Sequence, residues 1–192
     1  MRNTVMLPGP RAYSQGLARN RKLAMIPVSM AAALLEVEVA TVQGYIRRGL
    51  LEEIVVGPGR AWVGVSADGV RAMRLGKLRQ IRGLAKVAEP ILLQAAKART
   101  TIEYGADLMK PLGLDHQYAR DRDMIGKVLG SISTRTYRRD NRLLSVLAVR
   151  KDTGMPNTVF FDLARDLGAM SRTKTDEHFF RHEKKAVFDA YC

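Results

Sequence analysis

The spacing of hydrophobic positions in residues 26–74 changes from helical to strand-like, and this stretch organises the first half of the chain. Met30–Leu35 is a short apolar run preceded by Ser29, a residue type that caps helix N-termini, so we expect a helix there. Glu36–Glu38 interrupts the apolar run and predicts a turn.

A second helix is predicted for Val39–Arg48. Its apolar residues recur at helical spacing and should be buried on one face: Val39, Val42, Tyr45 and Ile46. Gly49 follows at the position where a helix end commonly needs a left-handed residue. Leu50 and Leu51 are expected to return to the core.

Two strands should come next. Ile54–Val56 and Ala61–Val65 are apolar and rich in β-branched residues, and Gly57-Pro58-Gly59 between them is typical of a tight turn. Ser66 is a suitable cap for another helix. We interpret residues 26–74 as a helix-turn-helix followed by a small two-stranded β wing.

The other face of the second predicted helix carries small, polar and basic residues: Ala40, Thr41, Gln43, Gly44, Arg47 and Arg48. A glycine inside a helix costs roughly 1 kcal/mol against alanine, but it lets another surface approach the backbone. Arginine and glutamine suit phosphates and base edges in a major groove. This face is a candidate DNA-binding surface, and a helical hairpin with a solvated basic face is the alternative.

A long helical pattern runs on to about Arg99, interrupted by Pro90, which should break or kink the helix or start a new one. It contains a narrow apolar seam at heptad-like spacing: Leu78, Ile81, Ala85, Ala88 and Leu92. We therefore predict a linker and dimerisation helix at 75–99 that makes the protein a homodimer. Ordinary packing against the C-terminal domain is the alternative.

Residues 100–192 should form a second, mostly helical domain with little sheet. Leu143–Val149 is a continuous apolar run and predicts a buried strand, followed by a tight turn at Asp152–Pro156. Helices are predicted at Thr101–Leu112, Asp121–Ser133, Val159–Leu167 and Asp176–Tyr191.

Composition adds a strong charge bias. The 192 residues include 32 Lys and Arg against 19 Asp and Glu, a formal net charge of +13, most of it in the first half. An excess of this size indicates a polyanionic partner, most often nucleic acid. The single cysteine, Cys192, excludes a disulfide within the chain, and no apolar run could span a membrane. We expect a cytoplasmic, nucleoid-associated protein.

Residues 26–74 resemble the MerR/excisionase group of winged helix-turn-helix domains. The residues that carry the resemblance are Val28–Leu35, Thr41–Val42, Tyr45–Leu51, Gly59–Trp62 and Val65–Ser66. Glu36–Val39 departs from the family's pattern, which more often has a glycine and a polar cap there. The resemblance implies a recognition helix at Val39–Arg48 and a wing that reaches DNA through Arg60, with Trp62 positioning it.

Residues 1–25 contain prolines, glycines and basic residues, and we predict a flexible basic arm. Arg21 and Lys22 stand just before the predicted DNA-binding domain and could add phosphate contacts. With Ser29, Arg60, Trp62 and the polar face of the second helix, they complete the predicted DNA-binding set.

The sequence gives little support for catalysis or metal binding. His178 and His182 are four residues apart, but no cysteine and only His116 remain to complete a metal shell, so a surface helix is the better interpretation. No strand-borne carboxylate cluster of the nuclease type is apparent. We predict no cofactor, no metal and no enzyme activity.

The C-terminal half resembles only uncharacterised bacterial proteins, through Leu143–Leu167. The order of its Tyr-Gly, Gly-x-x-Leu-Gly and Gly-x-Pro motifs is also similar to alkyltransferase-like DNA-repair domains. Their transfer reaction needs a cysteine in the middle of the domain, and this chain has none there.

The expected fold is thus mainly α with a small β wing: a winged helix-turn-helix at 26–74, a linker helix and an α-rich C-terminal domain. The expected function is a sequence-specific, double-stranded DNA-binding transcriptional regulator of a bacterium, phage or plasmid. Three alternatives stay open: an excisionase-like architectural protein, a nuclease-like enzyme in residues 100–192, and a module whose C-terminal half binds another protein.

Overall fold

The structure is a computed structural model of the chain and describes residues 4–7, 9–20, 23–171 and 173–191. The protein is mostly helical with a small mixed sheet, which confirms the mainly α fold predicted. The chain divides into two compact units, Met1–Leu78 (unit 1) and Arg79–Cys192 (unit 2). The candidate contacts Arg21 and Lys22 lie outside the described residues.

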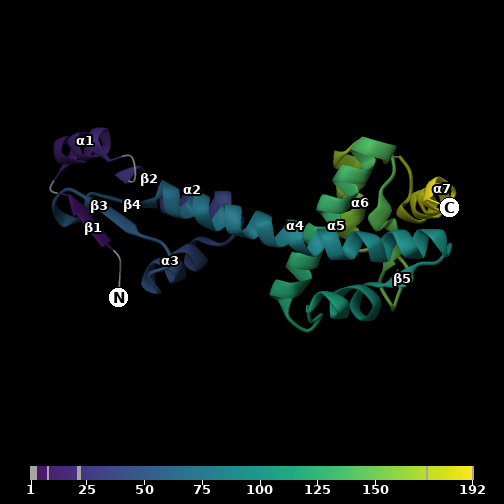
Figure 1. Ribbon diagram of the computed structural model, residues 1–192. Coiled ribbons are helices and arrows are strands. Elements are labelled where there is room, and N and C mark those ends of the chain that lie inside the picture. The colour runs from purple at the N-terminus through teal and green to yellow at the C-terminus, as the bar shows by residue number, and fades with distance from the viewer. Residues whose placement is uncertain (1–3, 8, 21–22, 172, 192) are drawn as a thin grey trace. The chain divides into compact units, whose positions relative to one another are not determined.

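Unit 1 is built around a sheet in the order β1-β3-β4-β2 (Figure 1). β1 runs parallel to β3, whereas β4 is antiparallel to β3 and to β2. β3 is buried along its whole length, because it is a central strand with a neighbour on either side. The strands are β1 (Thr4–Leu7), β2 (Met25–Ile26), β3 (Glu53–Val56) and β4 (Trp62–Ser66).

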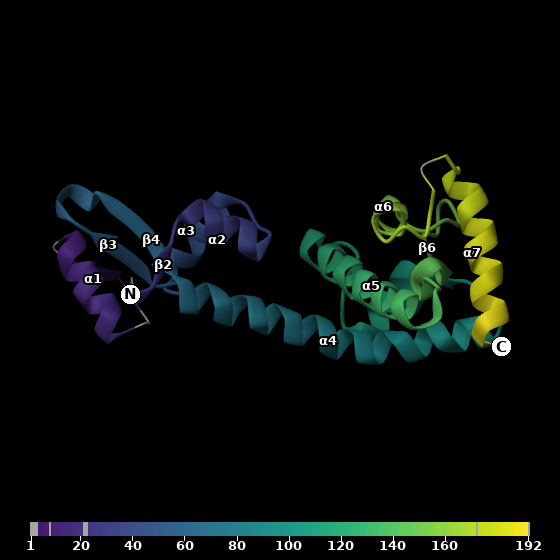
Figure 2. The same cartoon turned by 90° about the horizontal axis from the view of Figure 1, so that it is seen from above.

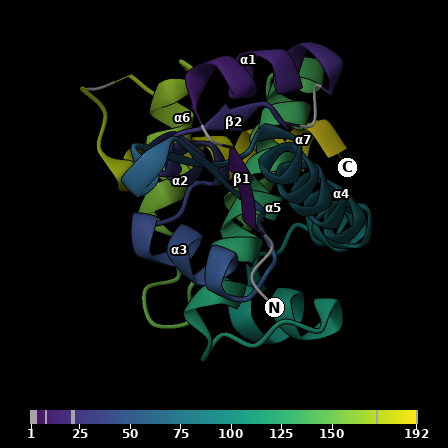
Figure 3. The ribbon, with the colours of Figure 1, turned by 90° about the vertical axis from the view of Figure 1, so that its left-hand side faces the viewer.

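Two predictions for this region are wrong. The segment predicted as a flexible arm contributes β1 and a helix, α1 (Pro10–Arg19), which lies on the opposite side of β1 from α3 in Figure 3. The strands β3 and β4, predicted as a two-stranded wing, are the centre of a larger sheet. The sequence pattern missed this because β1 is only four residues long and is stabilised by β3, a partner far away in the sequence.

α2 (Val28–Leu35) and α3 (Val39–Arg47) pack against each other in unit 1 (Figure 2). Val42 and Ile46 are buried as predicted, and they join a core cluster that also holds Ala31, Ala32, Leu35, Leu51, Val65 and Val70. Val39 and Leu50 were expected inside, but they are 42% and 56% exposed.

The turn between α2 and α3 depends on a left-handed residue. Glu36 has φ 56° and ψ 52°, a conformation that costs most side chains about 1–2 kcal/mol. This is the segment where the sequence departs from the helix-turn-helix pattern. At the far end of α3, Gly49 has φ 70°, as its C-terminal position predicted. α2 begins after Pro27, so Ser29 is an exposed residue of its first turn and not its cap.

α4 (Ala67–Lys97) begins after Ser66, whose Oγ accepts a hydrogen bond from the Gly69 N–H at 3.3 Å, and it continues through Pro90. The prediction that this apolar seam pairs with a second copy of the chain is wrong for most of its residues. Ile81, Ala85 and Leu92 are buried in the core of unit 2, so this chain already covers them, while Leu78 is 40% exposed. No helix in the described ranges combines the length and apolarity that crossing a bilayer requires.

Unit 2 packs three further helices around one apolar core with the second part of α4. They are α5 (Ala119–Asp140), α6 (Thr158–Asp166) and α7 (Asp176–Tyr191), and α7 has the predicted bounds. A short parallel pair of strands, β5 (Ile102–Glu103) and β6 (Ala148–Val149), completes the unit. The helix predicted over 101–112 is β5 followed by a π-helical turn, Tyr104–Met109, and a 3-10 turn, Lys110–Leu112.

The apolar run predicted as a strand is buried, but most of it is a 3-10 turn, Leu144–Leu147. Its first backbone N–H groups donate to side chains and not to a neighbouring strand. Glu183 Oε1 accepts from Leu143 at 2.7 Å, Thr136 Oγ1 from Leu144 at 3.3 Å, and Ser133 Oγ from Ser145 at 3.1 Å. Buried N–H groups need such partners, and α5 and α7 supply them here.

Gly44, inside α3, and Gly49, just after the end of α3, should respond oppositely to substitution by alanine. Gly49→Ala should lower the free energy of unfolding by about 1 kcal/mol because of its positive φ. Gly44→Ala should raise it by about 0.5–1 kcal/mol, because an added Cβ meets nothing within 4 Å. Trp62 is the single tryptophan, so its fluorescence during urea unfolding follows unit 1. Equal effects of the two variants would contradict this assignment.

The buried carboxyl of Glu183 should make the stability of unit 2 depend on pH. Burial raises the pKa of Glu183 above its ordinary 4.5, so folding favours the neutral acid. That contribution is complete below pH 4.5 and is lost as the pH rises through the raised pKa. Glu183→Gln should therefore gain stability over wild type between pH 4 and 8, measured by urea unfolding and circular dichroism.

A matched variant, Glu183→Leu, removes the acceptor for the Leu143 N–H. It should lose about 1–3 kcal/mol at pH 4, because a buried donor is left unsatisfied. A Glu183→Gln variant that keeps the pH dependence of wild type would show that another group is responsible.

Candidate nucleic-acid interface and a pocket in unit 2

The outward face of α3 is the candidate nucleic-acid interface. Because Val42 and Ile46 anchor the helix in the core, with Tyr45 packed beside them, the opposite side of α3 points outward. Ala40, Gln43, Arg47 and Arg48 are exposed, and Thr41 and Gly44 are partly exposed. The predicted set on α3 therefore shares one accessible face.

Gly44 has no role in the packing of its own unit that would require a glycine. A Cβ added there meets nothing within 4 Å, and the residue has an ordinary helical φ. Arg48 lies across this position: its Nε donates to the Gly44 carbonyl at 3.2 Å, and its guanidinium is 5.4 Å from the centre of the Tyr45 ring. The arginine is thus held along the helix surface beside an open stretch of backbone.

Arg60 is not a free cation at the tip of the β3–β4 hairpin. Its Nη2 donates to Glu53 Oε1, and the Glu53 side chain is buried while the Arg60 side chain is half exposed. Arg60 itself has φ 60°, next to Gly59 with φ 63°. Trp62 is 50% exposed on β4. A phosphate contact by Arg60 would compete with an ion pair that neutralises a buried carboxylate.

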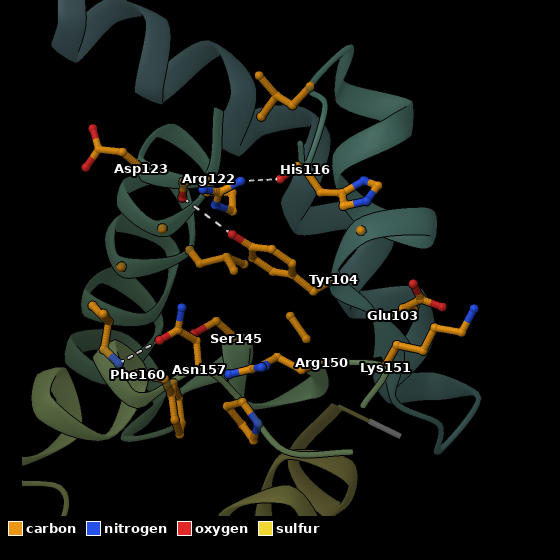
Figure 4. Close-up of a pocket in the computed structure, with 18 of the residues that line it drawn as sticks. Glu103, Tyr104, His116, Arg122, Asp123, Ser145, Arg150, Lys151, Asn157 and Phe160 are labelled. Atoms are coloured by element: carbon orange, nitrogen blue, oxygen red, sulfur yellow. Dashed lines mark hydrogen bonds between the residues drawn. The ribbon is translucent and has the colours of Figure 1, made fainter. Parts of the chain in front are cut away.

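Unit 2 contains a pocket of about 1140 Å³, which the sequence patterns did not predict (Figure 4). Its walls come from the π-helical turn, from α5, from the loop after β6 and from α6. Much of the lining is apolar: Ala106, Leu114, Leu129, Ala148, Pro156, Val159, Phe160 and Leu163. The pocket exists because three separate stretches of the chain, within 103–116, 122–130 and 145–163, meet there.

Tyr104 reaches across this pocket toward α5 (Figure 4). Its hydroxyl donates to the Arg122 carbonyl at 3.4 Å. Partial burial raises the pKa of Tyr104 above 10, and the nearby charge of Arg122 opposes that rise. The phenol is therefore neutral at physiological pH and can donate or accept a hydrogen bond. Ser145 lines the inner wall, with its Oγ 2.6 Å from Ser133 Oγ.

Charged side chains surround the apolar lining, and some of them pair with each other. Lys127 Nζ is 3.2 Å from Asp123 Oδ2, and Arg150 donates to both carboxylate oxygens of Asp152. The hydrogen bonds of Arg150 hold the pKa of Asp152 below its usual value. Arg122 donates to the backbone carbonyls of His116 and Gln117, which leaves its charge without a carboxylate partner among the described residues.

Ser145 is bonded to another serine and not to a histidine base. No three His, Cys, Asp or Glu residues of the described ranges gather as metal ligands would. His178 and His182 are exposed on α7. Of the acids that line the pocket, Asp123 and Asp152 are engaged in ion pairs, and Asp115 Oδ1 lies 3.7 Å from His116 Nδ1.

In comparisons with known proteins, no family model, no curated protein and no solved structure matches the chain.

The ion pair of Arg60 makes a testable contribution to unit 1. Arg60→Ala leaves the buried Glu53 carboxylate without its partner, so unfolding followed by Trp62 fluorescence should become easier by about 1–3 kcal/mol. The double variant Arg60→Ala with Glu53→Gln should recover part of that loss, because the buried charge is gone. A single variant as stable as wild type would mean that the pair contributes nothing.

Proposed function

We propose that the protein is a sequence-specific, double-stranded DNA-binding protein that regulates transcription, with α3 as its recognition helix. The observation that carries the proposal is the outward face of α3, where Gln43, Arg47 and Arg48 surround the open backbone at Gly44. An α-helix fits the major groove of B-DNA, and glutamine and arginine pair with base edges and phosphates.

The charge of the chain supports a polyanionic partner. A net charge of +13 attracts DNA at long range and contributes sequence-independent affinity through release of counterions. Exposed arginines also follow the start of α4, at Arg71 and Arg74. In this proposal these side chains bind phosphates, while the face of α3 reads the sequence.

The pairing of two short helices also supports the proposal. α2 packs on α3, the left-handed Glu36 makes the turn between them, and the β3–β4 hairpin follows α3 in the chain. The order agrees with the MerR-like resemblance, from which the role in transcription is inferred. Arg60 and Trp62 would position the β3–β4 hairpin beside the groove, and such a protein would reside with the nucleoid.

Arg47→Ala tests the contact directly. A target duplex is first obtained by selection from a random pool, and affinity is then measured by fluorescence anisotropy at several salt concentrations. Arg47→Ala should cost about 1–3 kcal/mol of affinity for a base contact, or lower the salt slope by about 1 for a phosphate contact. Arg181→Ala, at an exposed arginine of unit 2, is the matched control and should change neither.

Gly44→Leu separates loss of binding from loss of fold. A Cβ at this position meets nothing within 4 Å and leucine is a good helix former, so unit 1 should stay folded. Affinity should nevertheless fall at least about tenfold, because the helix can no longer approach the groove. Unchanged DNA affinity in both Arg47→Ala and Gly44→Leu would refute the role of α3. Strong bending of the selected duplex in a permutation gel assay would favour the architectural alternative.

A further inference from the structure

The pocket of unit 2 lies against a stretch of α5 backbone that the chain leaves uncovered. Gly126 and Gly130 are one turn apart on α5, and both line the pocket. A Cβ added at Gly126 meets nothing within 4 Å, and one added at Gly130 only reaches Leu163 at 3.9 Å. Neither glycine is needed for packing within unit 2, although each costs roughly 1 kcal/mol of helix stability against alanine.

The walls suit a flat, apolar body. Tyr104 and Phe160 are the aromatic side chains of the lining, and Leu129, Leu163 and Val159 surround them. The volume of about 1140 Å³ can hold a molecule of the size of a drug or a cofactor. Val159 is 61% exposed, so the pocket opens to solvent on the side of α6.

Cationic side chains outnumber carboxylates by one in the lining of the pocket, with Lys110, Arg122, Lys127, Arg150 and Lys151 against Glu103, Asp115, Asp123 and Asp152. Asp123 and Asp152 pair with Lys127 and Arg150, as described above. Among the described residues, Lys110, Arg122 and Lys151 also line the pocket without an ion-pair partner. Arg122 is held by two carbonyls, so its guanidinium has a fixed position and free donors.

We propose that this pocket binds a small organic anion with a flat aromatic body. The ring system would lie between the Tyr104 and Phe160 walls and the open backbone of α5. The anionic group would accept hydrogen bonds from Arg122 and attract Lys151. The proposal goes beyond DNA binding by α3 and does not depend on it.

Other occupants fit these observations less well. A metal ion needs convergent ligands, which the described residues do not offer here. A neutral apolar molecule would leave the charges of Arg122 and Lys151 without a partner in the complex. An organic cation would be repelled by the guanidinium of Arg122, which has no carboxylate partner among the described residues.

The experiment uses the full chain and the probe 8-anilino-1-naphthalenesulfonate, a flat aromatic sulfonate whose fluorescence rises in apolar surroundings. We expect saturable binding at one site per chain. N-phenyl-1-naphthylamine has the same ring system without the sulfonate, and it should bind at least about tenfold more weakly, because it cannot accept charge-assisted hydrogen bonds. Absence of saturable binding, or equal affinity for both probes, would overturn the proposal.

Gly126→Leu fills the pocket and should weaken sulfonate binding at least about tenfold while α5 stays folded, as circular dichroism would show. Gly83→Leu is the matched control: it is an exposed helical glycine of unit 2 with nothing within 4 Å, and it does not line the pocket. It should bind the probe as wild type does. Equal loss in both variants would mean that the probe binds elsewhere.

The role of charge is tested by Arg122→Gln. This variant should weaken binding of the sulfonate about tenfold and leave binding of the neutral amine unchanged, so the ratio of the two affinities falls. A change of both affinities by the same factor would show that Arg122 only shapes the pocket, and the anionic part of the proposal would be wrong.

Discussion

Burial of Val42 and Ile46 in the core of unit 1 is the interaction on which the candidate DNA-binding surface depends. These two side chains fix the rotation of α3 about its axis, and with a helical period of 3.6 residues the exposed positions follow from it. Gln43, Arg47 and Arg48 are exposed because they point away from the side of the helix that carries Val42 and Ile46. The left-handed Glu36 ends α2 before the turn into α3, and the left-handed Gly49 follows the end of α3.

An equivalent constraint in unit 2 is the need to satisfy the backbone of a buried turn. The N–H groups of residues 143–145 find acceptors on Ser133, Thr136 and Glu183. Those bonds tie α5 and α7 to the turn, and the chain leaves the turn through β6 toward the wall of the pocket. The shape of the pocket therefore depends on a small, buried polar network, which is costly to leave incomplete.

Both proposed binding surfaces contain helical glycines that their own unit does not require. Gly44 on α3 and Gly126 on α5 each face open space, and alanine would be the better helix former at both. A helix that gives up stability at an accessible position leaves its backbone open to close approach. The two surfaces differ in charge and shape: one is an exposed basic face, and the other is a largely apolar pocket with cations at its edge.

The sequence by itself determined the elements that rest on local periodicity. The bounds of α7, the burial of Val42 and Ile46 on α3 and the left-handed Gly49 were all predicted, because helical spacing and glycine chemistry act within a few residues. Only the tertiary structure decided that Thr4–Leu7 pairs with β3, that Ile81 and Leu92 face this chain's own core, and that three separate stretches of the chain enclose a pocket. These features arise from contacts between residues far apart in the chain, and a pattern of neighbouring side chains does not record such contacts.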